Sequence, residues 1–275
     1  MFRIRIQNKK KCIWYCSAVV SFLLFLLLLG WTNHLANTQD AQQMAGRWSE
    51  KKDVAQISCF FSSKAEVTED TIQSFEYSLK NVLQEASITE TSENPSARLW
   101  VDAYSADGKI TLVNGKNTLD ANAIGIGGDF FMFHPLKLIT GAYFSGNDLM
   151  QDYCIIDQDA AWQLFGSNDV VGMTVYIGNV PHIVTGVVQR PDSRMDKAAG
   201  LNSTVVYVSY ETLSAYGTNN GINHYEIVMP NPVDEFAYGK VKEGIGIDEK
   251  NVEIVENSRR YSLPNRIKTI LAFGT

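Results

Sequence analysis

Asp157 and Asp159 are the two residues of the sequence that most resemble a catalytic carboxyl pair. Two neighbouring carboxyl groups can act as general acid and base when their surroundings separate their pKa values. Here both stand where an apolar strand is expected to end and a short alanine-rich helix to begin. Carboxylates at that position cap the free backbone N–H groups of a helix. We therefore favour a capping role over catalysis.

Glycine-rich stretches are the second feature with potential chemistry. Residues 125–128 read Gly-Ile-Gly-Gly and could approach a phosphate group. A dinucleotide loop needs GxGxxG followed by a helix, whereas this stretch leads through aromatic residues to Pro135. We predict a flexible turn between two parts of a domain. Gly244 and Gly246 are predicted to end a helix.

Cysteine and histidine residues give no metal or redox motif. Cys59 and Cys154 fall in apolar, strand-like runs. An exported compartment would permit a disulfide between them, but free cysteines are among the most buried residues, so we favour two buried thiols and leave the disulfide open. The histidines are His34, His134, His182 and His224. They are widely scattered, and the sequence has no CxxC motif.

Motifs of common enzyme classes are also missing from the sequence. It contains no GxxxxGK[ST] loop, so it binds no ATP by that route. It also lacks the GxSxG motif that surrounds the nucleophilic serine of α/β-hydrolases. We therefore expect no enzyme activity, no cofactor, and no catalytic, cofactor-binding or metal-binding residues.

The chain has 275 residues and a mass of 30.7 kDa, with 45% apolar and 20% charged residues. These proportions exclude wholesale disorder. The net charge of −6 argues against a nucleic-acid partner, which generally needs a clustered basic surface. Residues 1–33 contain five basic residues and no acidic one. The remainder has 19 of the 24 basic residues and all 30 acidic residues, a net charge of −11.

Residues 12–32 form an uncharged and mainly apolar segment. A helix of about 20 residues spans the roughly 30 Å hydrocarbon core of a membrane. We predict an uncleaved signal-anchor helix, because the segment is long and the residues after it make a poor cleavage site; a cleaved signal peptide is the alternative. The basic tail 1–11 is predicted to be cytoplasmic, which places the main domain outside the cell membrane.

Strands and helices alternate in the exported part, which is typical of an α+β domain. Residues 33–54 are polar, contain good helix formers and are predicted to form a stalk. Thr68 is expected to cap a helix, and tight turns are expected at Asp107-Gly108 and at 114–117. The other predicted elements are strands at 57–61, 99–104, 204–208, 225–229 and 252–255, a helix at 157–165 ending at Gly166, a hairpin of 171–177 and 182–188 that turns at Gly178-Asn179, and a helix at 232–243.

The most regularly patterned stretch lies between two groups of flexible residues, 125–128 and 219–221. We therefore predict a two-lobed domain over residues 55–258, in which residues 126–225 form a compact insert lobe. Five aromatic residues are expected in the core between the lobes, although some of them could face a partner. They are Phe130, Phe131, Phe133, Tyr143 and Phe144.

Several ordered motifs lie within these residues. They are Ile126-Gly-Gly-Asp-Phe-Phe, Gly141-Ala-Tyr-Phe, the run from Cys154 to Gly166, Val171-Gly-Met-Thr-Val-Tyr-Ile-Gly, and His182-Ile-Val-Thr-Gly-Val-Val. Their order and spacing resemble the periplasmic core domain of MacB-type ABC transporter permeases, a family related to FtsX and to lipoprotein exporters. The resemblance covers residues 12–262 when the membrane segment is included.

The resemblance implies an N-terminal membrane helix, an extracytoplasmic domain and three further C-terminal membrane helices. Here the last residues, 259–275, contain an apolar run too short to span a bilayer, and several basic residues. We expect them to be a juxtamembrane segment. This departure from the family predicts either a truncated permease or a stand-alone form.

The function implied by the resemblance is that of the extracytoplasmic, membrane-anchored part of an ABC-type export or mechanotransmitting permease. Such a part couples a cytoplasmic ATPase to work outside the membrane. The implied partners are an ABC ATPase subunit, membrane lipid, and a second copy or paired permease, with no nucleic acid. The alternative is a membrane-anchored extracellular ligand-binding or interaction module without an ATPase partner.

Overall fold

The computed structural model describes residues 9–37, 40–49, 53–89, 98–190 and 203–260. The chain divides into two units, and each is described by itself. The first comprises Met1–Asp40 with Ser258–Thr275, and the second is Ala41–Asn257. Most of the predicted juxtamembrane segment 259–275 and most of the predicted cytoplasmic tail 1–11 lie outside the described residues.

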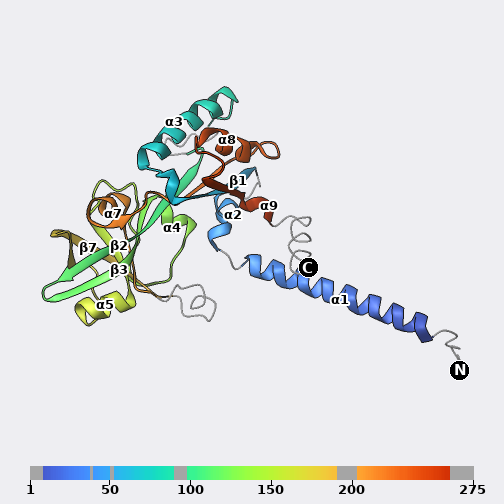
Figure 1. The fold of residues 1–275 in the computed structure, drawn as a ribbon, viewed down its shortest axis with the longest axis horizontal. Helices are drawn as coiled ribbons and strands as arrows, with labels where there is room; N and C mark the ends of the chain where they lie inside the picture. The colour runs from blue at the N-terminus through green and yellow to red at the C-terminus, as the bar shows by residue number, and fades with distance from the viewer. Residues whose placement is uncertain (1–8, 38–39, 50–52, 90–97, 191–202, 261–275) are drawn as a thin grey trace. The chain divides into compact units, whose positions relative to one another are not determined.

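Helix α1 (Lys9–Asn37) is the main element of the first unit (Figure 1). Its segment Ile13–Thr32 is 20 residues long, has a mean hydropathy of 2.3 and has none of its residues buried. The helix is therefore long and apolar enough to cross a membrane, as the sequence predicts.

The second unit contains the strands of a mixed sheet and several helices (Figure 1). The helices are α2 (Met44–Trp48), α3 (Glu69–Glu85), α4 (Phe130–Phe133), α5 (Gln158–Phe165), α7 (Tyr210–Tyr216), α8 (Phe236–Gly244) and α9 (Asn257–Arg260), the last of which continues into the first unit. The strands are β1 (Val54–Phe61), β2 (Val101–Asn114), β3 (Asn117–Gly128), β4 (Leu138–Gly141), β5 (Tyr153–Asp157), β6 (Thr174–Ile177), β7 (Val180–Val188), β8 (Val205–Ser209), β9 (Thr218–Asn219), β10 (His224–Pro230) and β11 (Val252–Glu256). Short 3₁₀ turns lie at Asp40–Gln42 and Ser63–Ala65. The α+β class is confirmed.

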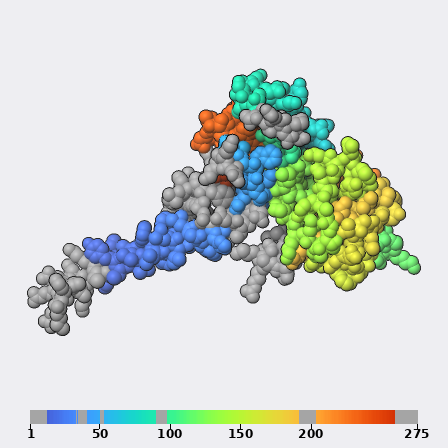
Figure 2. Space-filling view, turned by 180° about the vertical axis from the view of Figure 1, so that it is seen from behind, coloured from blue at the N-terminus to red at the C-terminus, as the bar shows by residue number. Residues whose placement is uncertain are grey.

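The strands follow one another in the order β11-β1-β10-β2-β3-β8-β5-β7-β4. Strand β6 pairs with both β7 and β2, so that β2, β3, β8, β5, β7 and β6 close a ring. Strands β11, β1 and β10 extend the sheet from β2 as an open part. Figure 1 shows α3 and α8 at one end of the unit and α5, α7 and β7 at the other, and Figure 2 shows the molecule from behind.

The long β2–β3 hairpin belongs to both parts of the sheet. Strand β3 pairs with β8, and β2 pairs with β6 and β9, so residues 126–225 share the sheet of residues 55–125. One cluster of buried apolar side chains also contains residues from both ranges. The predicted division at residue 126 therefore does not correspond to a break in the sheet or in the core.

The two faces of the open part are covered by different helices. Ile57 and Cys59 of β1 face the cluster that contains Phe75 of α3. Val101 and Val228 belong instead to a second cluster, with residues of α2 and α4. Met44 of α2 is 2% exposed in this cluster, so part of the segment predicted as a stalk, 33–54, belongs to the globular unit.

Candidate functional site

Asp157 is confirmed as a helix cap. Its Oδ1 accepts a hydrogen bond from the backbone N–H of Ala160 at 2.7 Å. Its Oδ2 accepts from the backbone N–H of Val205 at 3.0 Å and from Nη2 of Arg190 at 2.7 Å. Asp159 also contacts Arg190, at 2.6 Å, but its side chain is 45% exposed. Asp157 therefore links α5, β8 and Arg190, and Asp159 adds an exposed ion pair with the same arginine.

The glycines at 125–128 do not form the predicted flexible turn. They belong to β3, where Gly127 pairs with Tyr104 of β2. A Cβ atom on Gly127 would lie 2.0 Å from the Tyr104 ring, and one on Gly125 would lie 2.7 Å from Leu213. These positions need glycine because side chains pack directly against the strand backbone.

Cys59 and Cys154 are free, fully buried thiols on β1 and β5. Burial raises the pKa of both, that of Cys154 to about 12. The preferred interpretation, two buried thiols, is confirmed. The aromatic residues are also largely in the core. Phe130, Phe131, Phe133 and Phe144 are buried, and the partly exposed Tyr143 stacks on Phe131 at 4.6 Å between ring centroids.

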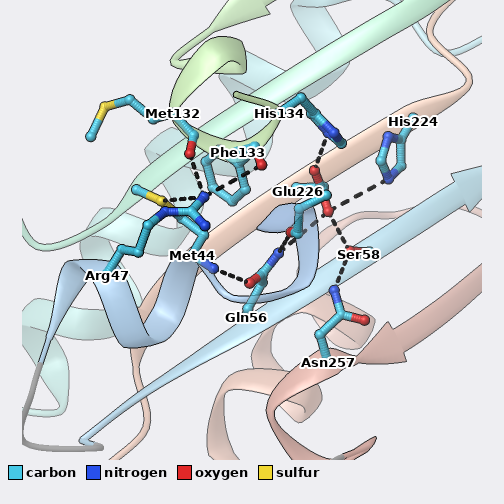
Figure 3. Close-up of polar contacts among 11 residues, drawn as sticks. Met44, Arg47, Gln56, Ser58, Met132, Phe133, His134, His224, Glu226 and Asn257 are labelled. Atoms are coloured by element: carbon cyan, nitrogen blue, oxygen red, sulfur yellow. Dashed lines mark hydrogen bonds and ion pairs between the residues drawn. The ribbon is translucent and has the colours of Figure 1, made fainter. Parts of the chain in front are cut away.

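In the part of the chain that the structure describes, a cluster of His134, His224 and Glu226 brings two imidazole rings and a carboxylate together (Figure 3). His134 ends α4, and His224 and Glu226 lie two residues apart on β10, so they share one face of that strand. Nε2 of His134 lies 2.6 Å from Oε2 of Glu226, and Nε2 of His224 lies 3.8 Å from Oε1. One ring nitrogen of each histidine and one carboxylate oxygen of Glu226 all lie within 4.8 Å of one another.

A buried network holds the Glu226 carboxylate in place. Ser58 of β1 donates to its Oε1 at 2.7 Å, and Asn257 donates to the Ser58 hydroxyl at 2.8 Å. Gln56 contacts the same oxygen at 3.5 Å and donates to the Ala41 carbonyl at 2.6 Å. The carboxylate is only 5% exposed, so its orientation is set by these partners and not by solvent.

The two imidazole rings are positioned by aromatic stacking. His134 stacks on Phe130, and His224 stacks on Phe60, each with 4.7 Å between ring centroids. Arg47 of α2 donates to the carbonyl of Met132 at 2.6 Å, which ties the end of α4 to α2. Both rings are therefore oriented before any ligand arrives.

Electrostatics separate the protonation states in this cluster. Burial alone would raise the pKa of Glu226, but contact with His134, the charge of His224 and the Ser58 hydroxyl together hold it below its ordinary value. Burial lowers the pKa of His224, and the neighbouring Glu226 offsets this only in part. The Glu226 carboxyl group is therefore ionised at neutral pH.

A second polar region is a surface cavity of about 590 Å³ between α3 and β2. Its lining residues are Glu76, Lys80, Gln84, Ile88, Thr89, Arg98, Leu99, Trp100 and Asp102. Burial raises the pKa of Glu76 to about 8, and the neighbouring Asp102 adds to the effect. Burial also raises the pKa of Asp102, although hydrogen bonds from Glu76 and Tyr225 oppose this. A protonated Glu76 thus donates a hydrogen bond to Asp102.

We expect the substitution Glu76→Gln to stabilise the domain above pH 8. The folded state keeps a proton on Glu76 that the unfolded state has lost, so the free energy of unfolding falls as the pH rises from about 4.5 to about 8. An amide donates to Asp102 without titrating. After allowance for solvent screening of this half-buried side chain, the gain at pH 8.5 is on the order of 1–2 kcal/mol.

Urea denaturation at pH 4 and pH 8.5 measures this difference. Glu85→Gln, an exposed position on the same helix, is the matched control and should change stability equally at both pH values. A Glu76→Gln protein with the parent's pH dependence would contradict the shared-proton assignment.

Sequence reasoning missed both polar regions. The alternation of Gln56 and Ser58 with apolar residues in β1, and of His224 and Glu226 around Tyr225 in β10, indicates one polar face on each strand. That signal could have paired His224 with Glu226. His134 lies 90 positions from His224 in the chain, and only the tertiary fold brings them together.

Comparison with known proteins gives a consistent family. The family model described as the MacB-like periplasmic core domain matches residues 21–254. The macrolide export ATP-binding/permease protein MacB of Chromobacterium violaceum is 32% identical over 99 residues, which cover 35% of this chain and 15% of that protein. MacB of Pasteurella multocida is 30% identical over 98 residues, covering 35% and 14%. The chain thus spans less than a fifth of the length of these curated relatives.

Two solved structures are also similar. The periplasmic region of MacB from Actinobacillus actinomycetemcomitans is 20% identical, with a TM-score of 0.47, and the match covers 79% of this chain and 92% of that one. The extracellular domain of the noncanonic ABC-type transporter YknZ from Gram-positive bacteria is 18% identical, with a TM-score of 0.44, and the match covers 73% and 99%.

Proposed function

Because the chain belongs to the family of MacB-like periplasmic core domains, we propose that it couples a cytoplasmic ABC ATPase to mechanical work outside the membrane. The observation that carries this proposal is the family match itself, which begins within the apolar segment Ile13–Thr32 and covers nearly all of the folded unit that follows it in the sequence. In this proposal the domain moves with membrane helices and catalyses no reaction. The ATPase is a partner subunit, or a part of a longer chain.

The orientation is part of the same proposal. Arg3, Arg5 and the lysines at 9–11 precede the apolar segment, and basic residues favour the cytoplasmic side. The acidic body would then lie outside, anchored in lipid by Ile13–Thr32. A second copy or a related permease would be a further partner in the membrane. Support comes from the single compact unit Ala41–Asn257, because transmitting force needs a body that moves as a whole.

We expect nucleotide to change the domain only when the ATPase partner is present. Hydrogen exchange across Ala41–Asn257 is measured in native membranes of cells that make this protein, with and without ATP plus vanadate. A coupled domain shows a several-fold change in exchange at some amides, because the trapped ATPase shifts the conformation of its permease. The same chain purified in detergent is the matched control and should not respond.

A specific observation also favours a second candidate, an anchored ligand-binding module. The cavity between α3 and β2 brings Glu76, Asp102 and Arg98 together with the apolar Leu99 and Trp100, as a small-molecule site would. Exchange that is identical with and without nucleotide in native membranes would contradict ATPase coupling and leave this candidate.

A further inference from the structure

We propose that His134, His224 and Glu226 form a binding site for a divalent late transition-metal ion of the Zn²⁺ class. The proposal is independent of the transport function, because it depends only on side chains within the folded unit. It also differs from the sequence-based expectation, in which the scattered histidines give no metal site.

The donor set selects the class of ion. Two imidazole nitrogens and one carboxylate match the three protein ligands of many Zn²⁺ sites that keep a fourth position open. Hard cations such as Ca²⁺ and Mg²⁺ prefer oxygen ligands, and this cluster offers a single carboxylate.

The distances require only small adjustments to coordinate an ion. Ligand atoms about 2.0–2.2 Å from a tetrahedral Zn²⁺ lie roughly 3.3–3.6 Å apart. Nε2 of His134 is 2.6 Å and Nε2 of His224 is 3.8 Å from the nearer Glu226 oxygens, so one contact would lengthen and the other shorten. Among the described residues, Nε2 of His224 makes no hydrogen bond although it is buried, and it is directed toward Glu226 (Figure 3).

The surroundings supply the partners that orient metal ligands. Ser58 fixes Oε1 of Glu226 and is itself fixed by Asn257. Phe60 and Phe130 hold the two rings by stacking. Such outer contacts commonly change metal affinity by 10–100-fold when they are removed. Ser58 is therefore assigned as a positioning residue of the site.

The full chain in detergent, stripped of metal, is titrated with Zn²⁺ by calorimetry, and with Co²⁺ while its visible absorption is recorded. We expect one equivalent of Zn²⁺ to bind, with an intense tetrahedral Co²⁺ spectrum. Zn²⁺ at 100 times the measured Kd should raise the melting temperature by about 5–10 °C. Mg²⁺ and Ca²⁺ should have no comparable effect.

Shape-conserving variants separate coordination from folding. His134→Phe and His224→Phe keep the stacking on Phe130 and Phe60 but lose the ligand nitrogen, and each should weaken Zn²⁺ binding at least tenfold. Ser58→Ala should weaken it about tenfold and leave one equivalent bound. His34→Ala, which removes an exposed histidine of α1, is the matched control and should bind as the parent does.

Circular dichroism without metal shows whether each variant folds. Failure of the folded parent to bind Zn²⁺ would overturn the proposal. Equal affinity of the parent, His134→Phe and His224→Phe would also overturn it, as would a Ca²⁺ affinity equal to that for Zn²⁺.

Discussion

We expect Asp157→Ala to lower the free energy of unfolding by about 3–4 kcal/mol. The side chain is 4% exposed and accepts hydrogen bonds from two backbone N–H groups, those of Ala160 and Val205. It also accepts two hydrogen bonds from Arg190. Alanine would leave the N–H groups of Ala160 and Val205 without the carboxylate that accepts their hydrogen bonds. It would also remove one of the two carboxylates, Asp157 and Asp159, that contact the Arg190 guanidinium.

Asp159→Ala is the matched control for this prediction. Asp159 contacts the same arginine at 2.6 Å, two positions further along the chain, but its side chain is 45% exposed. An exposed ion pair contributes only about 0–1 kcal/mol. Urea denaturation of both variants compares them directly. Asp157→Asn, which keeps an acceptor for the cap, should recover part of the lost stability. Similar losses for the two alanine variants would show that Asp157 does not have the buried anchoring role.

Local sequence rules correctly predicted the helix ends and turns whose structure depends on residues close by in the chain. Thr68 begins α3, Asp157 begins α5, and Gly166, with a φ of 73°, ends it. The β6–β7 hairpin turns at Gly178 and Asn179, which both have positive φ. In each case the decisive hydrogen bond or backbone conformation lies within about four residues of the signal. A short stretch of sequence is therefore sufficient to predict these caps and turns.

Predictions failed where a glycine serves a distant contact. The Asp107-Gly108 pair predicts a turn, but β2 continues through it to Asn114. A Cβ on Gly108 would lie 2.3 Å from the carbonyl oxygen of Thr218, whose strand β9 pairs with β2 at this point. The glycine permits this close approach and needs no positive φ. Thr218 lies 110 positions further along the chain, so the residues around Gly108 do not indicate this contact.

The cluster of His134, His224 and Glu226 could not be predicted from the sequence, because its members are also brought together from distant parts of the chain. Glu226 accepts one hydrogen bond from Ser58 of β1 and contacts His134 at the end of α4. The period of two along β10 places His224 beside Glu226, but no local rule selects His134 as the third member. Binding chemistry in this chain therefore depends on strand order, whereas helix caps depend on neighbours in sequence.

We expect Gly127→Ala to destabilise the domain by about 2–3 kcal/mol, because the strand is enclosed at this position. The new methyl group would lie 2.0 Å from Cζ of Tyr104, whose ring packs edge-on against Tyr210 with 5.9 Å between centroids. The backbone has little room to retreat, because Gly146 approaches it so closely that a Cβ on Gly146 would lie 2.4 Å from the Gly127 Cα. Thermal and urea denaturation should both show the loss.

The same substitution at Gly239 of α8 should instead raise the free energy of unfolding. No atom lies within 4 Å of a Cβ built there, so alanine meets no obstacle and improves helix propensity by about 0.5–1 kcal/mol. A double-mutant cycle tests the cause assigned to Gly127. In a Tyr104→Ala background the ring is gone, and Gly127→Ala should then lose most of its effect. An undiminished loss in that background would mean that the Tyr104 ring is not what requires glycine in β3, and would assign the requirement to the close approach of Gly146 instead.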